Sequence, residues 1–162
     1  MAFFKPHIRL KRITDVDIEL LKSNNIDTLL LDIDNTMSTH HGTVLVDGLI
    51  EWLNQMNSCK IKLIVLSNSK RDRVEPFAKR INLDFVSSGL KPLPFGYLKA
   101  IKMVGSEKRK TAIIGDQLFT DSFGARIVGI KSIILEPIEP EPMLSFRIRR
   151  YFEGKLYKLY KF

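Results

Sequence analysis

The sequence lacks the features of a disulfide-bonded, secreted or membrane-spanning protein. It has one cysteine, Cys59, which cannot form an internal disulfide, and no cluster of Cys and His residues with metal-ligand spacing. Charged residues interrupt every apolar run well short of the roughly 18 to 20 residues that cross a bilayer. The stretch from Met1 to Lys5 has no apolar signal-peptide segment. We therefore expect a cytoplasmic protein in which Cys59 fills core space.

Acidic residues are scarce at both ends of the chain. Residues 1–12 carry four basic side chains and no acid, and residues 143–162 carry six basic side chains and one acid, whereas the body between them is close to neutral. Two basic ends indicate either solubilising charge or an anionic partner such as phospholipid headgroups, nucleic acid or an acidic protein surface. The whole chain has 162 residues, 44% of them hydrophobic and 27% charged, which is typical of one globular domain and excludes wholesale disorder or a fibre.

Apolar runs alternate with helical patterns along most of the chain. The runs predict strands, and the segments with amphipathic spacing between them predict helices. Strands are expected at 28–33, 61–66, 83–86, 112–114 and 130–135, and helices at 49–57, 73–81, 95–104 and 122–128. This alternation predicts an α/β protein with a Rossmann-like fold, in which a mainly parallel five-stranded sheet carries helices on both faces.

The pattern also divides the chain into four segments. We expect a basic N-terminal segment at 1–24, a catalytic domain at 25–135, a proline-rich extended arm at 136–142 and a basic amphipathic helix at 143–162. The apolar face of that last helix could pack on the domain, on a partner or on an anionic membrane, and the sequence leaves these alternatives open.

Polar residues follow the predicted strands at the point where each strand ends. They are Asp32 and Asp34 after the first strand, Ser67 and Asn68 after the second, Lys91 after the third, and Asp116 and Asp121 after the fourth. In open α/β sheets the carboxyl ends of the strands form the ligand site, so these groups should converge. Converging carboxylates repel one another unless a cation such as Mg²⁺ binds them, and a carboxylate can act as a phosphoryl acceptor. Ser67, the amide of Asn68 and the Lys91 ammonium could hold phosphoryl oxygens.

These residues resemble the four ordered motifs of the haloacid dehalogenase (HAD) superfamily of phosphotransferases. Two segments resemble more narrowly the YqeG-like group of HAD subfamily IIIA, which is related to phosphatidylglycerophosphate phosphatases. They are Gly115-Asp-Gln-Leu-Phe-Thr-Asp121 and Gly89-Leu-Lys-Pro92. The resemblance covers about residues 25–135. An ordered set of four motifs is far more specific than a lone Asp-x-Asp pair.

The resemblance implies a role for each motif residue. Asp32 would be the nucleophile and Asp34 the general acid/base, while Ser67 and Lys91 would bind phosphate. Mg²⁺ would be held by Asp32, by Asp116 and by the backbone carbonyl of Asp34, so that the Asp34 side chain stays free to transfer a proton. Asp121 would support the metal site from outside, although it is equally suited to cap the following helix.

Motif spacing leaves no room for a cap domain. Only 30 residues separate Thr36 from Ser67, and 23 separate Ser67 from Lys91. We therefore expect an open site with Asp32 reachable from solvent, which suits a phosphate carried on something large.

The function that these observations predict is a Mg²⁺-dependent phosphomonoester hydrolase with an aspartyl-phosphate intermediate. Its substrate would be bulky or membrane-borne, with phosphatidylglycerophosphate as the one that the resemblance suggests, and the basic ends would hold the cytoplasmic protein peripherally on the inner face of an anionic membrane. The alternatives are a phosphatase for nucleic-acid ends, which we favour less, and a non-catalytic RNA- or ribosome-associated module on a HAD scaffold.

Overall fold

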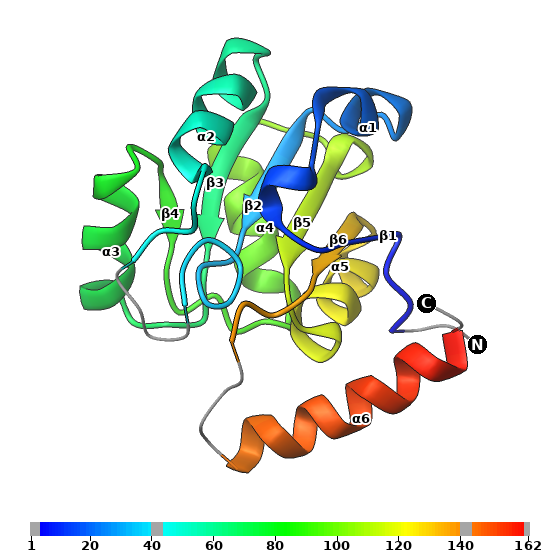
Figure 1. The fold of residues 1–162 in the computed structure, drawn as a ribbon. Coiled ribbons are helices and arrows are strands. Elements are labelled where there is room, and N and C mark those ends of the chain that lie inside the picture. The colour runs from blue at the N-terminus through cyan, green and yellow to red at the C-terminus, as the bar shows by residue number, and fades with distance from the viewer. Residues whose placement is uncertain (1–3, 40–43, 140–143, 161–162) are drawn as a thin grey trace.

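The computed structural model describes residues 4–39, 44–139 and 144–160, and its centre is a six-stranded sheet (Figure 1). All neighbouring strands are parallel, in the order β1-β6-β5-β2-β3-β4. The strands are β1 (Ile8–Leu10), β2 (Thr28–Leu31), β3 (Lys62–Leu66), β4 (Phe85–Val86), β5 (Thr111–Gly115) and β6 (Lys131–Leu135).

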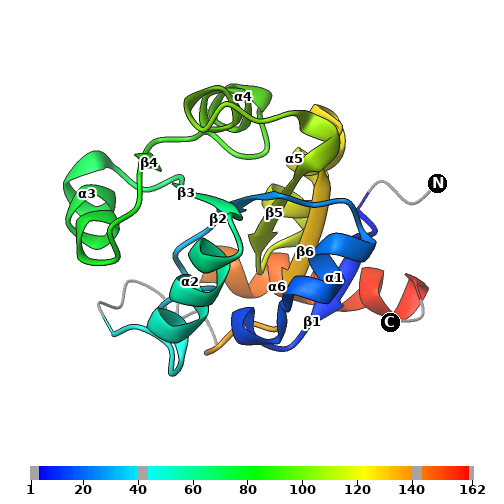
Figure 2. The ribbon, with the colours of Figure 1, turned by 90° about the horizontal axis from the view of Figure 1, so that it is seen from above.

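Helices cover both faces of the sheet (Figure 2). They are α1 (Ile18–Ser23), α2 (Leu49–Ser58), α3 (Arg71–Arg80), α4 (Pro94–Met103), α5 (Phe123–Val128) and α6 (Leu144–Tyr160), with a π-helical turn, η3 (Leu118–Ser122), before α5. Because side chains alternate along a strand, Leu29 and Leu31 of β2 pack under α1, α2 and α3, whereas Leu30 packs under α4 and α5. The sheet, whose central strands β2 and β5 are buried at every position, thus separates two cores.

The chain reverses its direction across the sheet between β2 and β5. Leu31 of β2 lies opposite Val65 of β3 on one side and Ile114 of β5 on the other. After β2 the chain builds β3 and β4 outward, then returns to add β5 and β6 on the other side. Such a switch point opens a crevice beyond the carboxyl ends of the two central strands, and Asp32 and Asp116 are the first residues after those ends.

The predicted fold class is confirmed, and the predicted strand count is wrong by one. The sixth strand, β1, lies in the segment that the sequence predicts only as a basic N-terminus, and Ile8 pairs with Ile133 at the sheet edge. This strand has only three residues, all half-buried, and Arg9 stands in the middle, so the sequence shows no apolar run there. Cys59 is exposed at the end of α2, so the expectation that it fills the core is also wrong.

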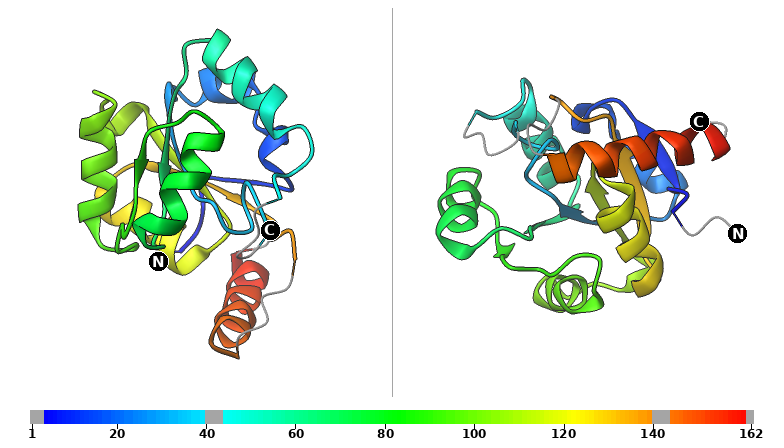
Figure 3. Two further views of the ribbon diagram at one scale, coloured as in Figure 1. Left: turned by 90° about the vertical axis from the view of Figure 1, so that its left-hand side faces the viewer. Right: turned by 90° about the horizontal axis from the view of Figure 1, so that it is seen from below.

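The last helix lies apart from the sheet and crosses one end of the domain (Figures 1 and 3). It is anchored by Glu153, which is buried, and by Tyr157, whose ring centroid lies 4.3 Å from the guanidinium carbon of Arg9. Its large apolar side chains remain exposed at Ile148, Tyr151, Phe152 and Leu159. Within the described ranges, no helix has the length and apolar character required to span a bilayer. The proline-rich arm falls partly outside the described residues.

Candidate active site

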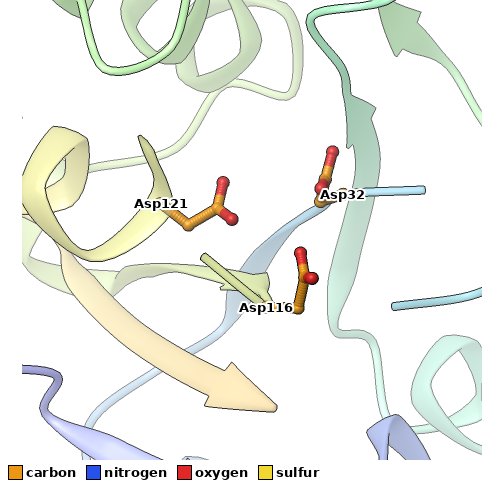
Figure 4. Close-up of side chains that lie close together, drawn as sticks. All are labelled: Asp32, Asp116 and Asp121. Carbon is orange, nitrogen blue, oxygen red and sulfur yellow. The ribbon is translucent and has the colours of Figure 1, made fainter. Parts of the chain in front are cut away.

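Three carboxylates meet at the carboxyl ends of the central strands (Figure 4). Asp32 follows β2, Asp116 follows β5 and Asp121 comes from η3. All three are buried, and one oxygen from each lies within 4.8 Å of the others. The three side chains come from different elements and lie close together, as the crevice at the switch point predicts.

Lys91 brings one positive charge into this acidic cluster. Its ammonium nitrogen lies 2.8 Å from Oδ1 of Asp32 and 2.7 Å from Oδ1 of Asp121, and almost none of the side chain is exposed. The Asn68 side chain holds the Lys91 backbone on both sides: Nδ2 donates to the Lys91 carbonyl at 3.0 Å, and Oδ1 accepts from the Lys91 amide at 2.6 Å. The Asn68 side chain therefore positions Lys91, a role that the sequence did not predict.

Burial governs the electrostatics of the cluster. It raises the pKa of Asp32 to about 7, although the neighbouring Lys91 ammonium acts in the opposite direction. Burial alone would lower the pKa of Lys91, but the carboxylates of Asp121 and Asp32 outweigh it and raise that pKa. Lys91 therefore stays charged at neutral pH, and positive charge added beside Asp32 would favour the ionised form of its carboxyl group.

The cluster fits a divalent cation. The cluster itself has three carboxylates and one ammonium, so its formal charge is −2 when all three acids are ionised. Carboxylate oxygens are the ligands that Mg²⁺ prefers, and a Mg²⁺ ion would supply the charge that stabilises an ionised Asp32. The residues that could hold it by side-chain oxygens are Asp32, Asp116 and Asp121.

Local backbone geometry places Asp121 in this cluster. Its Oδ2 accepts a hydrogen bond from the Gln117 amide at 3.2 Å, which closes the π-helical turn. A Cβ at Gly115 would overlap the Asp121 carboxylate, so the glycine at the end of β5 allows the close approach. The helix α5 has Ser122 at its N-cap, and Asp121 makes no cap there. The sequence left two roles open for Asp121, and the structure does not show one of them, the capping of α5.

The Asp34 side chain is not part of the acidic cluster and pairs with Arg73. Nη1 of Arg73 donates to Oδ2 of Asp34 at 2.8 Å, Nη2 bonds Oδ1, and Nη1 also reaches the Ser69 hydroxyl at 2.7 Å. The resemblance implies a free Asp34 side chain, and the structure instead shows a bidentate ion pair. The only sequence signal for Arg73 is its place in the first turn of the helix that follows the Ser67 motif.

Ser67 closes the site on the side of β3. It lies directly after that strand, is buried, and its hydroxyl accepts a hydrogen bond from the Ser69 amide at 3.1 Å. Because β3 neighbours β2 in parallel register, Ser67 and Asp32 leave the sheet side by side.

One feature of the site departs from the sequence prediction. Only 9% of the Asp32 side chain is exposed, because Lys91 packs against it, so the expectation of an openly accessible carboxylate is wrong in degree. Among the described residues between β2 and α2 there are only isolated bridges, Asp34 with Ser38 and Ser38 with Leu45, and no inserted domain.

The C-terminal helix also contributes to the site. One oxygen of Glu153 accepts hydrogen bonds from the Leu118 amide at 2.7 Å and from the Phe119 amide at 3.5 Å. These amides open η3, the turn that carries Asp121, so Glu153 satisfies backbone donors that the first turn leaves unpaired. In the sequence Glu153 is merely the one acid in a basic tail, and nothing there signals this contact.

Comparison with known proteins agrees with this geometry. A family model described as haloacid dehalogenase-like hydrolase matches residues 9–135. The chain belongs to this family. The predicted enzyme class is therefore confirmed at the level of a HAD-type hydrolase.

Individual HAD relatives support the narrower resemblance and the fold. The chain is 29% identical over 154 residues to a probable phosphatase, YqeG, of Bacillus subtilis, with 95% of this chain and 90% of the relative covered. A HAD family hydrolase from Deinococcus radiodurans, solved with bound phosphate and sodium, has the same fold, with a TM-score of 0.61 at 15% identity over 78% of this chain and 88% of that one. A 4-nitrophenylphosphatase from Thermotoga maritima gives 0.60 at 13% identity over 74% and 89%.

Proposed function

We propose that this HAD family member is a Mg²⁺-dependent phosphomonoester hydrolase that works through an aspartyl-phosphate on Asp32. The observation that carries the proposal is the buried cluster of three carboxylates around Lys91 at the switch point of the sheet. Mg²⁺ bound there would neutralise phosphoryl charge and keep Asp32 ionised. The role of each residue follows from its position in the cluster and from the family resemblance.

The reaction takes two displacements at phosphorus. In the first, an oxygen of Asp32 forms a bond to phosphorus while the ester P–O bond breaks, and Asp34 gives a proton to the leaving alcohol. In the second, Asp34 takes a proton from water, whose oxygen attacks the same phosphorus and releases phosphate from Asp32. The phosphoryl oxygens are held in both steps by Lys91, by Ser67 and by the backbone amide of Asn68. Asp116 would hold the metal, and Asp121 orients Lys91 and would support the metal site.

Arg73 gives the proposed acid/base residue a defined position. Its bidentate contact orients the Asp34 carboxylate beside the catalytic strand, and Ser69 orients the guanidinium in turn. For proton transfer Asp34 must exchange this contact for the ester oxygen, so Arg73 is a positioning residue rather than a catalytic one.

We further propose a bulky or membrane-borne substrate, and phosphatidylglycerophosphate is the one that the resemblance suggests. The support is the exposed face of α6, where Tyr151 and Phe152 adjoin Lys155 and Lys158, because aromatic and basic side chains together suit an anionic lipid interface. Glu153 contacts the loop after β5, so α6 lies on the catalytic side of the sheet. The same surface supports peripheral binding to the inner face of a membrane. Nucleic acid, the less favoured partner, would also bind the lysines but has less use for the exposed apolar side chains.

The deciding experiment replaces the proposed nucleophile. Asp32→Asn should abolish phosphate release from every ester that the native protein hydrolyses, because an amide is nearly isosteric but cannot attack phosphorus. The matched control is Asp72→Asn on the exposed surface of α3. Retained turnover by Asp32→Asn would remove Asp32 from its role. If the native chain releases no phosphate from lipid, nucleotide, sugar or protein substrates with Mg²⁺, the non-catalytic alternative would replace the proposal.

A further inference from the structure

A cavity of about 540 Å³ lies beside the catalytic loop, outside the acidic cluster. It is bounded by the residues after β1, the loop after β2 and the segment after β6, so it opens on the same edge of the sheet as Asp32. Its walls mix polar and apolar residues, and the apolar part includes Ile13, Leu45, Val46, Leu135 and Ile138. A cavity of this size holds a small organic group.

Two polar side chains at the buried end of this cavity have unused hydrogen-bonding capacity. Asn35 and Thr36 line the cavity and are buried, yet within the described part of the chain Nδ2 of Asn35 and Oγ1 of Thr36 have no hydrogen-bond partner. The other polar atom of the Asn35 side chain, Oδ1, accepts from the Glu139 amide at 3.2 Å, so the NH₂ group is the unused donor of this side chain. Buried donors without partners are costly, so an oxygen of a ligand or of a water molecule is needed to accept from them.

The rim of the same cavity carries positive charge. Lys11 and Arg12 line it with exposed side chains, and neither side chain forms an ion pair with any residue in the described ranges. Two acids also line the cavity. Glu136 lies 3.7 Å from Arg9, which offsets the charge of Glu136, whereas Asp47 is exposed to solvent. Lys11 and Arg12 belong to the acid-free N-terminal stretch, whose charge the catalytic reaction does not use.

We propose that this cavity binds a second anionic oxygen group, a carboxylate or a phosphate, on the leaving group of the substrate. The inference rests on the proposed phosphatase function, in which the reacting phosphoryl group occupies Asp32. Asn35 and Thr36 donate to the anion at the buried end, and Lys11 and Arg12 cover it at the rim. Donors without partners and unpaired cations together select an anion over a neutral group.

The two ends of such a substrate are within reach of each other. Asn35 follows Asp32 by three residues, and three residues of chain span at most about 11 Å. A three-carbon ester with its phosphate at Asp32 can therefore direct its other end toward Asn35. The cavity would then select among phosphate esters without taking part in the reaction at phosphorus.

The test compares three small esters that differ only at the far end: glycerol 1-phosphate, 3-phosphoglycerate and glycerol 1,3-bisphosphate. The native protein should hydrolyse at least one of the two anionic esters with a kcat/KM about tenfold or more above that of glycerol 1-phosphate, as one charge-assisted contact would give. The carboxylate of 3-phosphoglycerate and the second phosphate of the bisphosphate are tested separately, so the ester with the higher kcat/KM identifies the anion that the cavity prefers. The Lys11→Ala/Arg12→Ala double variant should lose this preference through KM, and its rate with glycerol 1-phosphate should not change.

A charge-matched double variant, Lys22→Ala/Lys102→Ala, removes two exposed lysines on α1 and α4 that do not line the cavity and should keep the preference. Thr36→Val, which keeps side-chain shape, should weaken it. Equal rates with all three esters, or a preference that survives in Lys11→Ala/Arg12→Ala, would overturn the proposal.

A binding arm separates this proposal from the phosphatase proposal. In the Asp32→Asn protein, which cannot turn over, 3-phosphoglycerate or the bisphosphate should shift the NMR resonances of the Asn35 side-chain amide, and glycerol 1-phosphate should not. If the native protein hydrolyses no ester but these shifts occur, the cavity is an anion site and the catalytic proposal fails. If hydrolysis occurs and no anionic ester moves the Asn35 resonances, the cavity proposal fails alone.

Discussion

Asp116 is fully buried, as is Asp121, whereas Asp32 keeps a small exposed surface. The role of Asp116 can be tested separately. If it is a metal ligand, Asp116→Asn should raise the Mg²⁺ concentration for half-maximal activity by about tenfold or more, because even residues behind the ligands have effects of that size. The measurement is a Mg²⁺ titration of phosphate release, with Asp72→Asn as the surface control. An unchanged titration curve would contradict the assignment.

Arg73 and Arg71 provide a matched pair for the positioning of Asp34. Both lie in the first turn of α3, but Arg73 binds Asp34, whereas Arg71 binds Glu75 on its own helix. Arg73→Met should lower kcat about tenfold, because Asp34 loses the contact that orients it, with a smaller effect on KM. Arg71→Met should leave both constants unchanged. Equal losses in the two variants would mean that α3 is disturbed as a whole.

The contact between α6 and η3 links the C-terminal helix to catalysis. Glu153→Ala removes the acceptor for the buried Leu118 amide and should lower the free energy of unfolding by about 1–3 kcal/mol, with a lower kcat because the turn that carries Asp121 loosens. Glu153→Gln retains an acceptor oxygen and should recover part of both losses. Lys158→Ala on the same helix is the control. Full stability and activity in Glu153→Ala would show that α6 only rests against the domain.

The edge pairing of β1 with β6 should depend on pH through His7. Nδ1 of His7 accepts a hydrogen bond from the Ser132 amide at 3.1 Å, and burial, assisted by Arg126 and Lys131, lowers the pKa of His7 below its usual value of 6.5. The folded state thus favours the neutral ring, and its stabilising effect, complete above pH 6.5, is lost as the pH falls below that value.

Hydrogen exchange measures this effect at the amides of His7 and Glu136, which donate across the β1–β6 edge to the carbonyls of Ser132 and Leu10 at 3.1 Å each. Their protection should fall between pH 7.5 and pH 5.5, after correction for the intrinsic exchange rate, and His7→Gln should abolish the pH dependence. Native protection that is independent of pH would show that the β1 edge does not depend on the neutral ring.

The strands and the strand-end residues could be predicted because their signals are local. Thr28–Leu31 and Thr111–Gly115 are apolar runs, and the acids that follow them stand next to them in the sequence. The pairs Arg73–Asp34 and Glu153–Leu118 could not be predicted, since they join residues 39 and 35 positions apart and depend on how α3 and α6 pack. The metal, phosphate and acid/base roles of the motif residues stay predictions, as do the proposed segment boundaries.

The α6 surface is where the whole molecule would meet a membrane. Lys155 lies 4.6 Å from the Tyr151 ring centroid, and Tyr151 packs edge-on against Phe152, so charge and aromatic area form one exposed patch. Each lysine near an anionic surface contributes about 1 kcal/mol, so Lys155→Gln/Lys158→Gln should weaken binding to anionic vesicles roughly 25-fold. Added salt should weaken native binding in the same direction.

The aromatic residues separate a membrane from other anionic partners. Tyr151→Ser/Phe152→Ser should also reduce vesicle binding, because the rings bury apolar area at the headgroups, but should change RNA binding less. Ile127→Ser removes an exposed apolar side chain from α5 and is the control that should bind as the native chain does. These proteins are compared by co-sedimentation with anionic vesicles and with neutral vesicles, and with RNA at matched phosphate concentration. Equal binding to anionic and neutral vesicles would rule out the anionic membrane as the partner of this surface. The same conclusion would follow if the native chain bound RNA more tightly than vesicles and both double variants weakened RNA binding equally.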